Sequence, residues 1–135
     1  MLLNLSYNDQ SLKEKINLSV GSPFSLLERL KKKGVGSPRL IISESSINIH
    51  NLLILDKNIN FCNIEIRPKG IIIRFRSLLE TYGLVVPFYK LKLYKGKANQ
   101  YSIYNDSTFI KIEVKKIDDH AFFKKLSTEK NSYKY

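Results

Sequence analysis

FCNIEIRPKGIIIRFR, residues 61–76, is the stretch that decides the fold of this 135-residue chain. On both sides of the tetrapeptide RPKG, every second residue is apolar. Such alternation is typical of a strand with one buried face, and a proline in second place presets a tight turn. We therefore predict a β-hairpin whose inward side chains are Cys62, Ile64, Ile66, Ile71, Ile73 and Phe75 and whose outward ones include Arg74 and Arg76.

The following segments alternate too, but the phase of the alternation changes. Apolar side chains fall on even positions over residues 84–88 and on odd positions at Leu91 and Leu93. A strand keeps its phase unless a bulge or bend intervenes, and Pro87, which has no N–H to donate, belongs at an edge or a bulge. We therefore expect one sharply bent strand around residues 87–90. Two further strands are predicted at residues 101–103 and 110–114, with a turn at 105–107.

A helix is predicted on each side of these strands. The first covers residues 23–33, with Ser22 as its cap, an apolar stripe of Phe24, Leu27 and Leu30, and Gly34 at its end. The second covers residues 118–130, with Asp118 or Asp119 as its cap and Phe122 and Leu126 facing the core. Residues 1–21 fit two short strands or a loose arm, residues 39–43 and 47–55 fit strands, the second buried on both faces, and residues 56–60 fit a turn.

Together these elements predict one mostly β domain of the α+β class over residues 1–135. It has an N-terminal arm and helix at 1–38, a strongly bent antiparallel sheet or partial barrel at 39–117, a capping helix at 118–130 and a frayed tail at 131–135. A single cysteine, Cys62, excludes an internal disulfide and cysteine-cluster zinc sites. Because the N-terminus lacks a basic region and an unbroken apolar core, we expect no signal peptide and a cytoplasmic protein.

The segment VVPFYKL at 85–91 adds a resemblance to this pattern. It lies between the strand GIII at 70–73 and the terminal helix DDHAFFKKL at 118–126. In this arrangement, residues 61–127 resemble bacterial pleckstrin-homology-like (PH-like) domains and their GRAM-type relatives. The resemblance implies a bent antiparallel sheet or barrel whose open end is covered by the C-terminal helix. It gives no role to residues 1–60, and it transfers no binding residue, because this fold serves lipid, peptide and protein binders alike.

The chain is strongly basic, with 23 Lys and Arg against 12 Asp and Glu and a net charge of +11. This charge favours an anionic partner, but most of the cations are lysines, which also serve plain solubility. The best candidate surface interleaves cations with an aromatic ring at Lys90, Lys92, Tyr94, Lys95 and Lys97. Whether these lysines bind a partner or only discourage edge pairing of the sheet stays open at this point.

Three functions follow from these residues. The first is a non-catalytic, PH-like binding module without a cofactor, which docks on a protein or an anionic membrane surface through those five residues. The second is a nucleic-acid-binding β-protein, in which Arg74 and Arg76 join the same surface. The third is a metal-dependent nuclease built on Asp106, Glu113 and Lys115. No phosphate-binding loop is present, because Gly34-Val35-Gly36 follows a predicted helix instead of preceding one.

Overall fold

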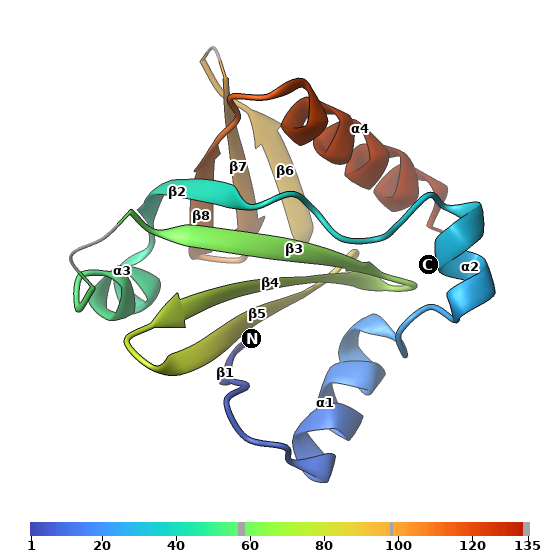
Figure 1. Ribbon diagram of the computed structural model, residues 1–135, viewed down its shortest axis with the longest axis horizontal. Coiled ribbons are helices and arrows are strands. Elements are labelled where there is room, and N and C mark those ends of the chain that lie inside the picture. The colour runs from blue at the N-terminus through green and yellow to red at the C-terminus, as the bar shows by residue number, and fades with distance from the viewer. Residues whose placement is uncertain (57–58, 98, 134–135) are drawn as a thin grey trace.

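The computed structural model describes residues 1–56, 59–97 and 99–133. The strands are β1 (Leu2–Asn4), β2 (Leu40–Ser45), β3 (Phe61–Arg67), β4 (Gly70–Ser77), β5 (Glu80–Pro87), β6 (Leu91–Lys95), β7 (Gln100–Asn105) and β8 (Thr108–Glu113). The helices are α1 (Gln10–Val20), α2 (Leu26–Lys31), α3 (Ile47–Leu53) and α4 (Ile117–Ser132). The predicted mostly β fold with a C-terminal helix is confirmed (Figure 1).

All the strands belong to one antiparallel sheet in the order β1-β5-β4-β3-β2-β8-β7-β6. The sheet is curled and open, and β6, β7 and β8 cross the direction of β3, β4 and β5 steeply (Figure 1). Strand β2 joins the two halves, because it pairs with β3 on one side and with β8 on the other. We call β3–β5 the first half of the sheet and β6–β8 the second half.

The hairpin expected at residues 61–77 is confirmed. Cys62 pairs with Phe75 and Arg67 with Gly70, so Pro68 and Lys69 form the turn between β3 and β4. The inward side chains are buried in the main core, as the alternation predicted. Gly70 is required at this turn, because a Cβ there would lie 2.4 Å from the carbonyl oxygen of Val86.

The single bent strand predicted around residues 87–90 is wrong. Strand β5 ends at Pro87, a turn with a hydrogen bond from Lys90 N–H to the Pro87 carbonyl follows, and β6 begins at Leu91. The two strands lie far apart in the sheet order, so the turn resets the phase of the alternation between two separate strands. Pro87 does stand at an edge, because β1 reaches along β5 only to Leu84.

The bend comes instead from β2. The pairing of β2 with β8 shifts register between Ile42 and Glu44, which places a bulge there. A bulge leaves an extra residue on one strand and increases the local twist. This bulge lies on the strand that belongs to both halves, where a change of direction curls the whole sheet.

Residues 47–53 form a helix, and Ile54 and Leu55 a turn, in place of the strand predicted at 47–55. Helix α3 covers Ile47–Leu53 and buries only Ile49 and Leu53, whereas Ile54 and Leu55 are exposed. A short apolar run does not distinguish a buried strand from a helix that buries one face. The turn expected at 56–60 lies partly outside the described residues.

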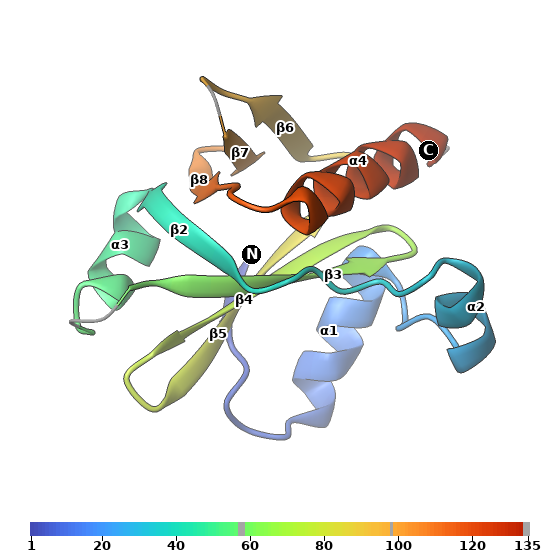
Figure 2. The same ribbon diagram turned by 45° about the horizontal axis from the view of Figure 1, so that its top comes forward.

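The N-terminal residues contain one short strand, β1, as predicted, and a helix where a second strand or a loose arm was expected. Asp9 caps α1 by accepting a hydrogen bond from Ser11 N–H, and α1 buries Ile16 and Val20. These side chains pack on Ile72 and Val85, which point outward from β4 and β5. Helix α1 therefore covers part of the outer face of the first half (Figure 2).

The helix predicted at 23–33 is shorter than expected. Ser25, and not Ser22, caps α2, and of its predicted apolar stripe only Phe24 is buried while Leu27 and Leu30 are exposed. Helix α2 is held from its C-terminal end, because Lys125 of α4 donates hydrogen bonds to the carbonyls of Lys32, Lys33 and Gly34 at 2.9, 3.3 and 3.1 Å.

Helix α4 covers the open end of the sheet, as predicted. Phe122 and Leu126 are buried in the core, and Phe123 stacks on Tyr101 of β7 with ring centroids 4.2 Å apart. The N-cap is Lys116 and not Asp118 or Asp119. Asp119 instead accepts hydrogen bonds from the backbone N–H groups of Lys115 and Lys116.

Candidate functional site

The predicted surface residues separate into two groups. Arg74 and Arg76 lie on β4, whereas Lys92 and Tyr94 lie on β6, and four strands stand between β4 and β6 in the sheet order. The arginines therefore do not extend the lysine surface through neighbouring strands. We name the second group, Lys90, Lys92, Tyr94, Lys95 and Lys97, the lysine–tyrosine surface.

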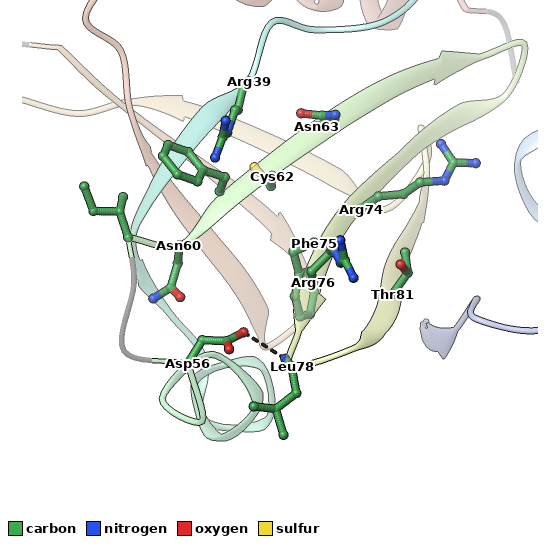
Figure 3. A pocket seen from close by; sticks show the side chains of 12 residues that line it. Arg39, Asp56, Asn60, Cys62, Asn63, Arg74, Phe75, Arg76, Leu78 and Thr81 are labelled. Atoms are coloured by element: carbon green, nitrogen blue, oxygen red, sulfur yellow. Dashed lines mark hydrogen bonds between the residues drawn. The ribbon is translucent and has the colours of Figure 1, made fainter.

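Arg74 and Arg76 border a depression of about 920 Å³ on the outer face of the first half. We call it the arginine depression. Arg39, just before β2, lines it as a third arginine, and Arg39 and Arg76 approach it from different segments of the chain (Figure 3). Its polar lining also includes Asn60, Asn63 and Thr81. The only carboxylate among the described lining residues is Asp56.

The arginines of the protein differ in the hydrogen-bond and ion-pair partners of their guanidinium groups. Arg67 is buried and bonds the Gly21 carbonyl at 3.0 Å, which ties the end of α1 to the sheet. Arg74 donates to Glu65 at 2.7 Å. Arg39 lies over the Phe61 ring at 3.7 Å, and no hydrogen bond or ion pair joins Arg39 or Arg76 to the described part of the chain. Their guanidinium groups are thus available to a ligand.

Glu65 offsets part of this positive charge. Its carboxylate accepts from Arg67 Nε at 2.6 Å and from Arg74 Nη1 at 2.7 Å. Burial alone would raise the pKa of Glu65, but the hydrogen bonds and charges of Arg74 and Arg67 outweigh it and lower that pKa. Glu65 therefore stays ionised and holds Arg74 in place, which leaves Arg39 and Arg76 as the unneutralised cations of the depression.

Exposed apolar side chains adjoin the depression. Asp56 Oδ2 accepts a hydrogen bond from Leu78 N–H at 2.8 Å, and Ser77 Oγ donates to the Leu52 carbonyl at 2.6 Å, so the end of α3 is fastened to the β4–β5 turn (Figure 3). The exposed apolar residues on these two segments and at Ile59 are Ile54, Leu55, Ile59, Leu78 and Leu79, and we call them the apolar end. Ile59 and Leu78 also line the arginine depression.

The β4–β5 turn itself is unusual. Ser77 pairs with Glu80, so Leu78 and Leu79 are its two central residues, and Leu78 has φ +55°. Two-residue turns with positive φ normally carry Gly, Asn or Asp, because a bulky side chain is strained there. Leu79 is 89% exposed. Nothing in the local packing of this turn therefore calls for two leucines.

The lysine–tyrosine surface lies mainly on the outward face of the second half. Lys92 and Tyr94 point outward from β6, Lys95 and Lys97 are exposed at its end, and Lys90 in the preceding turn lies 3.5 Å from Asp106. Tyr94 contacts the edge of Tyr104 on β7, with centroids 5.6 Å apart. Tyr104 in turn contacts Phe109 on β8 at 5.5 Å, so the lysines flank a short row of aromatic rings.

The three residues of the nuclease hypothesis are not brought together. Asp106 occupies the turn before β8 and Glu113 is the last residue of β8, so the two carboxylates lie at opposite ends of that strand. Lys115 lies 3.7 Å from Glu113 only. Among residues 1–56, 59–97 and 99–133, no three His, Cys, Asp or Glu side chains gather in a way that could hold a metal ion.

Cys62 lies in the core, as the alternation indicated. Burial raises the pKa of its thiol to about 12, so the thiolate needed for nucleophilic chemistry does not form near neutral pH. The two histidines are separate as well: His50 is exposed on α3, and His120 on α4 contacts the Tyr101 ring at 6.2 Å. These residues do not form a catalytic group.

Sequence reasoning missed Arg39 and the apolar end. Arg39 joins Arg76 only because β2 pairs with β3 and β3 with β4, and no local pattern states that order. The leucine pair did leave a signal. Leu78-Leu79 links the strand ending in Phe75 to the one containing Leu84, without the glycine, asparagine or proline that usually marks a turn.

Comparisons with family profiles, with curated proteins and with solved structures found no match. In the described part of the chain, no helix has both the length and the hydropathy that crossing a bilayer requires.

Proposed function

We propose that this protein is a non-catalytic, PH-like binding module that docks on an anionic partner through the arginine depression. One observation carries the proposal: the guanidinium groups of Arg39 and Arg76 line one depression without an intramolecular hydrogen bond or ion pair to the described residues. The PH-like assignment is supported by the order of elements, since an antiparallel sheet with a curl is followed by a helix over its open end.

The side chains of the depression suit phosphate or carboxylate groups. A guanidinium presents its N–H donors in a planar fork that matches two oxygens of such a group, and it is more weakly hydrated than an ammonium. The amides of Asn60 and Asn63 and the hydroxyl of Thr81 add uncharged hydrogen-bonding groups in the same lining. An anion there would meet cations on two sides.

The test is a titration of the ¹⁵N-labelled protein with tripolyphosphate, followed by NMR. We expect the shift changes to centre on Arg39, Asn63 and Arg76. The variant Arg39→Gln/Arg76→Gln should weaken binding by about thirtyfold, since each cation near an anionic surface contributes about 1 kcal/mol. Lys92→Gln/Lys95→Gln removes the same charge elsewhere and is the matched control. If both variants weakened binding equally, the affinity for tripolyphosphate would come from the net charge of the protein and not from the arginine depression.

A second candidate function is binding of single-stranded nucleic acid by the lysine–tyrosine surface. The row formed by the exposed Tyr94 and the partly buried Tyr104 and Phe109 favours it, because aromatic rings beside lysines can stack bases while the lysines contact phosphates. Binding of a short oligouridylate should then fall steeply with salt, and it should fall further in Tyr94→Ala by about 1–3 kcal/mol per stacked base. An oligouridylate affinity that Arg39→Gln/Arg76→Gln lowers more than Tyr94→Ala would assign nucleic acid to the arginine depression instead.

A further inference from the structure

We infer that the anionic partner is a lipid membrane with acidic headgroups, and that the apolar end enters its interface while Arg39 and Arg76 contact the headgroups. This inference rests on the proposed function and names the partner of the same site. It is carried by the position of the apolar end, which shares Ile59 and Leu78 with the lining of the arginine depression.

The first step of the argument is the exposure of the apolar side chains. Single exposed leucines are ordinary on a protein surface, but apolar side chains gathered at one place mark a contact site. Two hydrogen bonds, from Leu78 N–H to Asp56 and from Ser77 Oγ to the Leu52 carbonyl, fasten the end of α3 to the β4–β5 turn. The exposed apolar residues that directly follow α3 and those of the turn therefore lie on segments that are held together.

The second step is the turn sequence. Leu78 adopts a positive φ that favours glycine, and Leu79 beside it is 89% exposed. A residue type that is unfavourable for its backbone conformation, and that does not pack against the rest of the protein, is expected at a functional site. A turn that projects two leucines fits insertion between lipids, where the apolar side chains leave water.

The third step is charge. Acidic lipids attract cations that lie next to the inserted side chains, and Arg39 and Arg76 occupy that position. Among the described residues, two carboxylates flank the apolar end, and each keeps its negative charge while it accepts hydrogen bonds from uncharged groups of the protein. Asp56 accepts from Leu78 N–H, and Glu80 accepts from Asn4 Nδ2 at 3.2 Å and from Tyr7 at 3.5 Å. A soluble anion would complement the arginines but not the leucines, whereas a membrane with acidic headgroups complements both.

The absence of tryptophan from the sequence makes the test direct. Leu79→Trp places one reporter at the apolar end, and Ile117→Trp places a matched reporter at the start of α4, where the side chain is 87% exposed. With vesicles of phosphatidylcholine and phosphatidylglycerol, we expect a blue shift and quenching by brominated lipid for Leu79→Trp only. Phosphatidylcholine vesicles alone should give much less binding.

A second variant separates this inference from the proposed function. Leu79→Ser, at an 89% exposed residue outside the lining of the arginine depression, should lower vesicle binding by about tenfold, because less apolar surface leaves water. It should leave tripolyphosphate binding unchanged, and that binding also shows that the variant is folded. Unchanged vesicle binding in this variant, or equal spectral responses of both tryptophans, would overturn the inference. If the unmodified protein did not bind tripolyphosphate, the proposed function would be overturned instead.

Discussion

The outer faces of the two halves of the sheet differ in what lies on them. On the first half, α1 packs over Ile72 and Val85, and the arginine depression occupies the part that α1 leaves open. On the second half, Tyr94, Tyr104 and Phe109 contact one another, with lysines beside them. The first face is shaped by neighbouring elements, whereas the second is a regular strand surface.

This difference shows why the net charge of +11 does not by itself locate a site. Lys90 and Lys111 of the second half each lie near a carboxylate, at 3.5 Å from Asp106 and 3.2 Å from Glu44. In the first half, Arg39 and Arg76 remain unpaired among the described residues around a depression. The number of cations matters less than whether the fold holds them around one space.

The largest expected effect concerns the cover of the first half. Ile72 points outward but is fully buried under α1, so Ile72→Ala should lower the free energy of unfolding by about 3 kcal/mol. Tyr104 points outward from the second half and is only partly buried, so Tyr104→Ala should cost about 1 kcal/mol. Urea unfolding measures both. Equal losses would mean that the two outer faces are alike and that α1 does not pack on β4.

Much of the first half could be predicted from the sequence. Alternation in one hairpin fixes which side chains point inward, and it correctly placed Cys62 and Phe75 inside. It also placed Arg74 and Arg76 on the outward face of their strand. These predictions succeed because a period of two is a local property of a strand and does not depend on its neighbours.

Other predictions failed where the decision is not local. The continuous apolar run at residues 52–55 indicated a buried strand, whereas Ile49 and Leu53 pack on the core from one face of a helix. The phase change near Pro87 was assigned to a bend because the sequence does not state that β5 and β6 are separate strands. The candidate site shares this difficulty, since Arg39 reaches Arg76 through the pairing of three strands.

The next effect compares two turns, one in each half. Leu78 in the β4–β5 turn and Asp106 in the β7–β8 turn both have positive φ, at +55° and +57°. Aspartate tolerates this region better than leucine, so Leu78→Gly should stabilise the protein by up to about 1 kcal/mol and Asp106→Gly by less. Thermal and urea unfolding check this order. A larger gain for Asp106→Gly would remove the argument that the leucine turn is strained.

The smallest effect concerns the one carboxylate that holds an arginine of the depression. The pKa of Glu65 is lowered from its ordinary value of 4.5, because the bonds and charges of Arg74 and Arg67 outweigh its burial. Because the pKa of Glu65 is lower in the folded than in the unfolded protein, its ionised carboxylate stabilises the fold at pH values above the pKa of the unfolded state. This contribution is lost as the pH falls through the pKa of the folded state. Glu65→Gln should therefore cost about 1 kcal/mol or less at neutral pH, and this cost should vanish in acid.

Glu44, paired with Lys111 at 3.2 Å on the second half, provides the matched control. Its side chain is 61% exposed, so Glu44→Gln should change stability little at any pH. Urea midpoints of the three proteins between neutral pH and about pH 3 measure the difference, since glutamate side chains become protonated over this range. If Glu44→Gln lowered the free energy of unfolding as much as Glu65→Gln does, with the same dependence on pH, the ion pairs of the two halves would contribute equally to stability. The arginine depression would then have no electrostatic distinction from the rest of the surface.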